Sequence, residues 1–173
     1  MERKPHSGSS SGGEQTHVRR AGETDAEAAC QVIRRSITEL CRDDHRDDPS
    51  SLSLWLANKT PENLKAWIGD PENYMLVAGA VGAVIGVAAM RGPGRVMLNY
   101  VSPAARLRGV SKALMAALEA EARARGFEAL TLDSTSTARG FYRSIGYDEA
   151  GAPRPGFGVT LRFPMVKALQ PRT

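Results

Sequence analysis

Three basic side chains surround a glycine immediately before a stretch with helical periodicity. They are Arg106, Arg108 and Lys112, and the glycine is Gly109. The N-terminus of a helix carries unpaired backbone N–H groups and a partial positive charge, so further cations there are unfavourable unless an anion lies among them. A glycine leaves room for a ligand to approach those N–H groups. The pattern therefore predicts a turn that binds an anion such as phosphate.

The common nucleotide-binding loops do not match this stretch. Neither G-x-x-x-x-G-K-[ST] nor G-x-G-x-x-G after a first strand occurs in the chain. Residues 106–111 read Arg-Leu-Arg-Gly-Val-Ser. This stretch resembles the pyrophosphate-binding motif of the GNAT superfamily of acetyl-CoA-dependent N-acyltransferases: Gln or Arg, two residues, Gly, one residue, and Gly or Ala. Ser111 replaces the last small residue, which is a mild departure because serine is also small.

A second group of residues strengthens the resemblance. Ala138, Phe141–Tyr142 and Gly146–Tyr147 are spaced as in the helix that closes the cofactor site of that superfamily. Two spaced motifs are more specific than either alone. The resemblance covers roughly residues 16–167, and residues 96–147 carry nearly all its specificity.

The resemblance implies an α/β fold with an α+β mixed sheet, in which a central, mostly antiparallel, twisted sheet of about six to seven strands is flanked by about four helices. The strand "RVMLNYV" would splay from the strand "LTLDS", and the pantetheine of acetyl-CoA would lie in the gap between them. The implied cofactor-binding residues are Tyr100, Val101, Arg106, Leu107, Arg108, Gly109, Val110, Ser111, Lys112, Ser134, Ala138, Phe141 and Tyr142.

Tyr142 matches the superfamily position whose hydroxyl faces the coenzyme A sulfur, which implies a catalytic role. A tyrosine with a pKa of about 10 is less acidic than a thiol near 8.5, so full proton transfer is uphill by roughly 2 kcal/mol. Hydrogen bonding to the developing thiolate is the expected role.

The general base is not evident. Many relatives carry a glutamate on the fourth strand, but "VMLNYV" contains no carboxylate. Deprotonating a lysine-like amine at pH 7 costs roughly 4.6 kcal/mol, whereas an α-amine near pKa 8 costs only about 1.4 kcal/mol. Either a weakly basic amine reacts without a dedicated base, or another segment supplies the base.

The segment "CRDDHRDDP" is the alternative source of a base. In the superfamily, the region between the first two helices commonly borders the acceptor site, so its acids could attract a cationic acceptor and its histidine could accept a proton. The competing interpretation of this segment is a solvent-exposed loop. Trp55 and Trp67 could form a wall of the acceptor pocket, and the competing interpretation is that they pack on a buried helical face. No spacing of metal ligands is diagnostic, and no metal is expected. The substrate-binding candidates are Asp44, His45, Asp48 and Trp55.

Periodicity and turn residues predict the order strand, two helices, three strands, helix, strand, helix, strand. The first helix covers residues 23–41, with Thr24 or Asp25 as its cap, and Thr60 caps the second helical region at Pro61. Antiparallel strands with turns near residues 80–82 and 92–94 follow. A helix from Val110 ends at Gly126, with four charged residues facing water: Glu119, Glu121, Arg123 and Arg125.

Composition sets the broad class. Residues 1–15 are mainly Ser, Gly and charged residues, which predicts a disordered tail, and residues 16–170 are predicted to form a single domain. Both cysteines, Cys30 and Cys41, fall on one face of the first helix about 16 Å apart, which excludes a disulfide between them there. No apolar run is long enough for a membrane span and no signal sequence is evident, so a cytoplasmic location is expected.

The resemblance to the GNAT superfamily implies an N-acetyltransferase that moves an acetyl group from acetyl-CoA to a primary amine of a small molecule or peptide, by direct attack in a ternary complex. The alternative is an acyl-CoA-binding sensor or regulator of the same fold without turnover. A net charge of +4 without interleaved aromatic residues predicts no nucleic-acid partner. Relatives often dimerise, so a homodimer remains open.

Overall fold

The computed structural model describes residues 16–80 and 83–170, so the predicted N-terminal tail lies outside the described residues. The helices are α1 Ala26–Arg35, α2 Arg42–His45, α3 Pro49–Leu56, α4 Pro61–Gly69, α5 Val110–Ala124 and α6 Arg139–Ser144. The strands are β1 His17–Arg20, β2 Asn73–Ala80, β3 Ala83–Arg91, β4 Arg95–Val101, β5 Ala129–Ser134, β6 Asp148–Glu149, β7 Arg154–Pro155 and β8 Leu161–Ala168.

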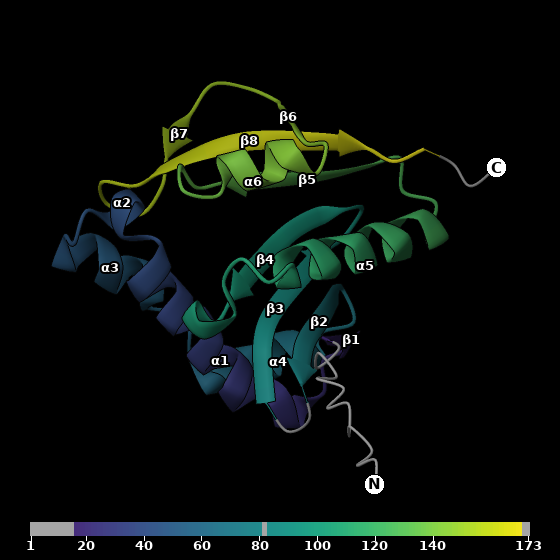
Figure 1. Cartoon of the computed structure of the whole chain (residues 1–173), viewed down its shortest axis with the longest axis horizontal. Coiled ribbons are helices and arrows are strands. Elements are labelled where there is room, and N and C mark those ends of the chain that lie inside the picture. Colours follow the sequence, from purple (N-terminus) through teal and green to yellow (C-terminus); the bar gives the residue numbers. More distant parts are fainter. Residues whose placement is uncertain (1–15, 81–82, 171–173) are drawn as a thin grey trace, which may run out of the picture.

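The strands form one mixed sheet in the order β1-β2-β3-β4-β5-β8-β6, with β7 paired to β8 (Figure 1). The β4–β5 pair is parallel, and the other strand pairs are antiparallel. This arrangement confirms the expected fold class. The two-residue strands β6 and β7 were not predicted, because two residues are too short to show an alternating pattern.

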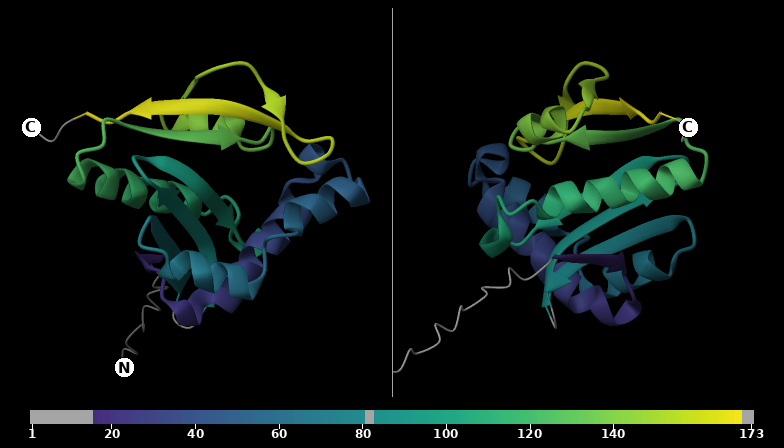
Figure 2. Two further views of the ribbon diagram at one scale, coloured as in Figure 1. Left: turned by 180° about the vertical axis from the view of Figure 1, so that it is seen from behind. Right: turned by 45° about the vertical axis from the view of Figure 1, so that its right-hand side comes forward.

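The two faces of the sheet are covered by different helices, as the views in Figure 2 show. In β2, Met75 and Val77 pack with α1 and α4, whereas Leu76 and Ala78 pack with α5. This alternation follows from the two-residue period of a strand. Both faces are therefore apolar, and the sheet lies between two helical layers.

The first helical region is longer and less regular than one α-helix. A 3₁₀ turn over Glu23–Asp25 precedes α1, and a π-helical turn over Ser36–Leu40 follows it. Cys30 and Cys41 are buried in the cluster that contains Ile33 and Ile37, as the helical spacing predicted. The caps of α3 and α4 are Asp48 and Thr60, which accept hydrogen bonds from the backbone N–H groups of Ser51 and Asn63.

Glu119 of α5 does not face water as predicted, since only 7% of the residue is exposed. Both of its carboxylate oxygens accept hydrogen bonds from Lys167 Nζ of β8 at 2.8 Å. The residue follows Leu118 on the buried side of the helix, and no sequence pattern indicates that β8 brings a cation there. Pairing offsets the cost of burying the carboxylate.

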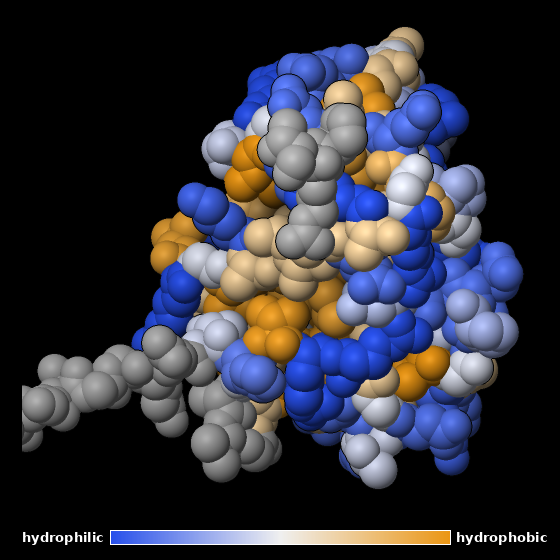
Figure 3. All heavy atoms as spheres, turned by 90° about the vertical axis from the view of Figure 1, so that its right-hand side faces the viewer, coloured by the Kyte–Doolittle hydropathy of each residue, from blue (hydrophilic) through white to orange (hydrophobic). Residues whose placement is uncertain are grey.

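Figure 3 shows the face at the right-hand side of Figure 1, where hydrophilic side chains surround smaller hydrophobic patches. A folded chain normally leaves scattered apolar side chains on its surface. Within residues 16–80 and 83–170, no helix combines the length and apolar character needed to cross a bilayer.

Candidate functional site

Strands β4 and β5 are paired at only one point, between Arg95 and Thr131. The N–H of Thr131 also donates to the Gly94 carbonyl at 2.9 Å. Beyond this junction β4 stays paired with β3 and β5 stays paired with β8, so the two strands diverge (Figure 1). The facing edge of β4 is left with backbone groups that can bind an extended ligand.

Two cavities open onto this gap. The larger, of about 660 Å³, is lined by the start of α5, by α6 and by the π-helical turn. The smaller, of about 360 Å³, is lined by residues from α3, α4, β8 and the segment before β8. Both include residues 96–98 and Tyr100 of β4 and residues 133–135 at the end of β5. The diverging strands therefore connect two sites that lie on opposite sides of the gap.

The basic turn before α5 has the backbone geometry of an anion-binding site. Gly109 caps the helix with φ of +78°, and a Cβ at this position would meet nothing within 4 Å. Leu107 also has a positive φ, and 93% of the residue is exposed. Within the described residues, the backbone N–H groups of Gly109, Ser111 and Lys112 have no hydrogen-bond partner. Such free N–H groups at a helix N-terminus favour an anion.

The predicted cofactor-binding residues gather around the larger cavity, with one exception. Arg108 does not line it. The side chains of Arg106, Arg108 and Lys112 are exposed, and none is ion-paired with another described residue. The predicted residues that line the larger cavity are Tyr100, Val101, Arg106, Leu107, Gly109, Val110, Ser111, Lys112, Ser134, Ala138, Phe141 and Tyr142.

Tyr142 of α6 lines the larger cavity with its hydroxyl held by β4. Asn99 Nδ2 donates to the Tyr142 oxygen at 3.2 Å. Burial raises the pKa of Tyr142 to about 12, although the hydrogen bond from Asn99 opposes the shift. The ring also packs edge-to-face against Phe141 and Tyr147, with centroids 5.2 and 5.6 Å away. The phenol is therefore neutral and oriented.

Asn99 is a site residue that the sequence motifs do not predict. It lies in the apolar strand "VMLNYV", where many relatives carry a glutamate as the general base. Its Oδ1 atom is buried and has no hydrogen-bond partner among the described residues. A single amide in an otherwise apolar strand is the signal that could have identified it, because buried polar groups need partners.

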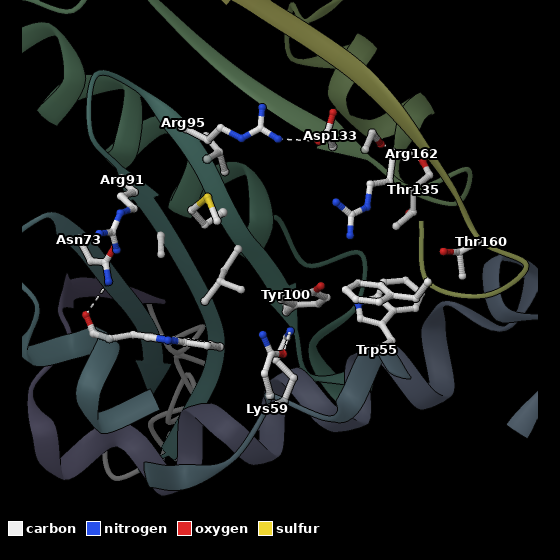
Figure 4. A pocket seen from close by; sticks show the side chains of 18 of the residues that line it. Trp55, Lys59, Asn73, Arg91, Arg95, Tyr100, Asp133, Thr135, Thr160 and Arg162 are labelled. Carbon is white, nitrogen blue, oxygen red and sulfur yellow. Dashed lines mark hydrogen bonds and ion pairs between the residues drawn. The ribbon is translucent and has the colours of Figure 1, made fainter. Parts of the chain in front are cut away.

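The lining of the smaller cavity includes aromatic and cationic side chains (Figure 4). Trp55 stacks on Phe157 with centroids 6.0 Å apart, so it is both buried and a wall of the cavity. Lys59 and Arg162 also line the cavity. The two interpretations of Trp55 from the sequence are therefore compatible.

Residues 42–48 of the acidic segment lie outside both cavities, although Cys41, which precedes them, lines the larger one. Asp44, His45 and Asp48 do not line either cavity. Residues 42–45 fold into α2, which buries Asp44 and leaves His45 only 1% exposed, so a solvent-exposed loop is the wrong description of these two residues. Asp44 Oδ1 accepts a hydrogen bond from the Thr137 N–H at 3.3 Å, and Asp48 caps α3. These polar groups hold neighbouring segments together, and this placement does not support their predicted contact with substrate.

A family model described as an acetyltransferase (GNAT) domain matches residues 45–169, which is more than half of the chain. The chain belongs to the GNAT acetyltransferase family. This assignment confirms the resemblance that the two motifs indicated, although the matched range says nothing about the acceptor.

Solved structures of the same fold agree with this family assignment. A GCN5-related N-acetyltransferase from Rhodopseudomonas palustris is 26% identical, with a TM-score of 0.79 over 89% of this chain and 96% of that one. PaiA N-acetyltransferase from Thermoplasma acidophilum, in complex with coenzyme A, is 18% identical, with a TM-score of 0.74 over 89% and 99%. The ribosomal-protein-S18-alanine N-acetyltransferase from Escherichia coli is 18% identical, with a TM-score of 0.66 over 92% and 97%. No curated protein matches the chain.

Metal-ligating side chains are not clustered in the described part of the chain. Among residues 16–80 and 83–170, no three or more His, Cys, Asp or Glu side chains are grouped so that they could hold a metal ion.

Proposed function

We propose that the chain is an N-acetyltransferase that moves an acetyl group from acetyl-CoA to a primary amine. The observation that carries this proposal is the opening between β4 and β5, with the basic turn and Tyr142 around the larger cavity and a second cavity beyond the gap. Acetyl-CoA would lie in the larger cavity and the amine would enter from the smaller one. The coenzyme A complex of PaiA, a protein of the same fold, is consistent with this choice of donor.

The residues present fit coenzyme A. The free N–H groups at Gly109, Ser111 and Lys112 suit a pyrophosphate, and the absence of a side chain at Gly109 allows close approach. The open edge of β4 suits the amides of pantetheine. Basic side chains at Arg106 and Lys112 would add charge complementarity.

Bound acetyl-CoA supplies an activated acetyl thioester, so that a C–N bond replaces the C–S bond while the amine loses one proton and the sulfur gains one. Tyr142 is suited to hydrogen-bond the leaving sulfur. Because Asn99 donates to the Tyr142 oxygen, the phenolic proton is free to point toward another acceptor. With a pKa of about 12 against about 8.5 for a thiol, full proton transfer would cost roughly 5 kcal/mol. Donation of a hydrogen bond without transfer is the role that fits.

The carboxylate in the smaller cavity is poorly suited to act as the base. Asp133 is paired with Arg95 and with Arg154. Burial raises the pKa of Asp133, but the hydrogen bonds from Arg154 and Arg95 outweigh it and hold the pKa below its usual value. An amine that loses its proton to water is therefore proposed, which favours acceptors with a weakly basic amine.

Calorimetric binding of acetyl-CoA to the intact protein and two glycine variants tests the cofactor site. Gly109→Glu is expected to weaken binding at least tenfold, because it puts a side chain and a negative charge at the proposed phosphate position. Gly126→Glu is the matched control, since Gly126 lies at the other end of α5 with φ of +77° and a Cβ there would also meet nothing within 4 Å. It is expected to leave the affinity within about twofold. Equal losses in both variants, or no binding by the intact protein, would contradict the proposal.

Release of free thiol separates an enzyme from a sensor of the same fold. The oriented hydroxyl of Tyr142 favours turnover. Acetyl-CoA binding with no thiol release across a panel of primary amines would instead favour the sensor.

A further inference from the structure

The smaller cavity carries more positive than negative charge. Its ionisable lining consists of Lys59, Arg91, Arg95, Asp133 and Arg162, together with the phenol of Tyr100. Arg95 is paired with Asp133, and Arg91 is paired with Asp70 at 2.9 Å. Within the described residues, Lys59 and Arg162 have no carboxylate partner. Two positive charges therefore face the cavity without a counterion from that part of the chain.

Lys59 is an unusual residue to leave without a counterion, because it is only 6% exposed. Its Nζ atom donates to Asn58 Oδ1 and lies 5.8 Å from the centroid of the Trp67 ring. Burial, followed by the charge of Arg162, lowers the pKa of Lys59. A buried ammonium is costly unless it is paired, so an anionic group in the cavity would be stabilising.

Three hydrogen bonds hold the backbone from which the Lys59 side chain extends. Its N–H donates to the Leu56 carbonyl at 3.0 Å. Its own carbonyl accepts from Cys30 Sγ at 3.1 Å and from Arg34 Nη1 at 3.0 Å. The backbone of Lys59, in the connection between α3 and α4, is therefore tied to α3 and to α1.

Arg162 approaches the same space from β8 (Figure 4). Its guanidinium lies over the Phe157 ring at 4.9 Å from the centroid, and Phe157 in turn stacks on Trp55. The side chain makes no hydrogen bond to any described residue. A guanidinium with one face on an aromatic ring keeps its N–H groups for a carboxylate, which it can bind through two parallel hydrogen bonds.

From these observations we infer that the acceptor is a small amino carboxylic acid, with its carboxylate held between Lys59 and Arg162 and its apolar part against Trp55 and Phe157. This inference rests on the proposed function and names the substrate class. A cavity of about 360 Å³ is at the lower end of the range for small-molecule sites. Polyamines and aminoglycosides, which are polycations, do not suit it.

The test compares amino acids with their carboxamides as acceptors, using leucine, methionine and phenylalanine and measuring both thiol release and equilibrium binding. The carboxamide keeps the size of the acid but removes its charge. A neighbouring carboxylate also raises the pKa of an amine, so amine reactivity alone would favour the carboxamide. At least tenfold better binding and kcat/KM for the acids is the expected result.

Substitutions test whether Lys59 and Arg162 cause the preference for the acids. Arg162→Leu and Lys59→Met are expected to weaken binding of the acid at least tenfold while the carboxamide changes less than threefold. Lys65→Met is the control, because it removes the same charge from a lysine that lies outside both cavities and pairs with Glu23 at 3.4 Å. It is expected to change the binding of neither the acid nor the carboxamide. Acetyl-CoA affinity and circular dichroism establish that each variant is folded.

The outcomes separate the two proposals. Thiol release with no preference for acids, or a preference that persists in both variants, overturns the inference and leaves the proposed function standing. A variant-sensitive preference in binding without any thiol release supports the carboxylate site and contradicts acetyl transfer. No difference in binding between acid and carboxamide overturns the inference even where no turnover is seen.

Discussion

At the residue scale, the hydrogen bond between Asn99 and Tyr142 joins a strand to a helix across the larger cavity. The sequence predicts the tyrosine from a motif but gives no indication that its partner is an amide 43 residues earlier. The bond leaves the phenolic proton available, and burial keeps that proton in place at neutral pH. The pair therefore orients one donor toward the proposed position of the sulfur.

Tyr142→Phe is expected to lower kcat for acetyl transfer by about 10²- to 10³-fold, because one oriented hydrogen-bond donor is lost in the transition state. The affinity for acetyl-CoA, measured by calorimetry, is expected to stay within about threefold. Tyr147→Phe is the control, since the Tyr147 hydroxyl is buried without a partner among the described residues and lies outside both cavities. A similar loss of kcat in both variants would indicate a packing effect.

At the element scale, the junction of β4 and β5 determines where the site opens. Gly94 precedes β4 with φ of +101°, and its carbonyl accepts the hydrogen bond from the Thr131 N–H. A Cβ at Gly94 would collide with the Ala129 carbonyl oxygen, whereas one at Gly92 would meet nothing within 4 Å. Two nearby glycines in one turn therefore differ in the space around them.

Gly94→Ala is expected to lower the thermal midpoint more than Gly92→Ala. Both substitutions put a side chain at a positive φ, but φ of +52° at Gly92 lies in the left-handed helical region and φ of +101° at Gly94 lies outside it, so backbone strain and the collision act in the same direction at Gly94. Overpacking of about 1–3 kcal/mol corresponds to a difference of roughly 2–12 °C at this chain length. Thermal unfolding followed by circular dichroism measures it. Equal midpoints would mean that the backbone at this junction can move to accept the methyl group.

At the scale of the whole molecule, the four tyrosines share one electrostatic property. Burial raises the pKa of Tyr74, Tyr100, Tyr142 and Tyr147 above the ordinary value. An unfolded chain loses these protons near pH 10, while the folded chain retains them to higher pH. The folded state thus binds more protons above pH 10, and its stability is expected to fall as pH rises.

Alkaline titration checks this expectation. Tyrosinate absorbance should remain low near pH 10 and rise together with the loss of circular dichroism. For Tyr142, a shift to about 12 corresponds to roughly 3 kcal/mol of stability lost between pH 10 and pH 12. Tyr142→Phe should therefore reduce the dependence of stability on pH in this range. Reversible ionisation of several tyrosines near pH 10 with unchanged circular dichroism would contradict the prediction.

The sequence by itself determined the family, the order of the main elements and the residues of the basic turn. These features depend on local chemistry: helical and strand periods, capping residues, and a glycine with a positive φ next to free N–H groups. The same local reasoning placed Cys30 and Cys41 in a common buried cluster. Such properties require few contacts between distant segments.

Only the tertiary structure decided which polar groups meet. Lys167 was brought to Glu119, Asn99 to Tyr142, and Arg162 to the cavity that holds Lys59, each across a long sequence separation. The tertiary structure also buries Asp44 and His45 away from the cavities, although the composition of their segment is typical of an acidic loop. The physical reason is that a polar side chain is expected to face solvent when only its sequence is known, whereas folding can supply its partner from any strand or helix packed against it.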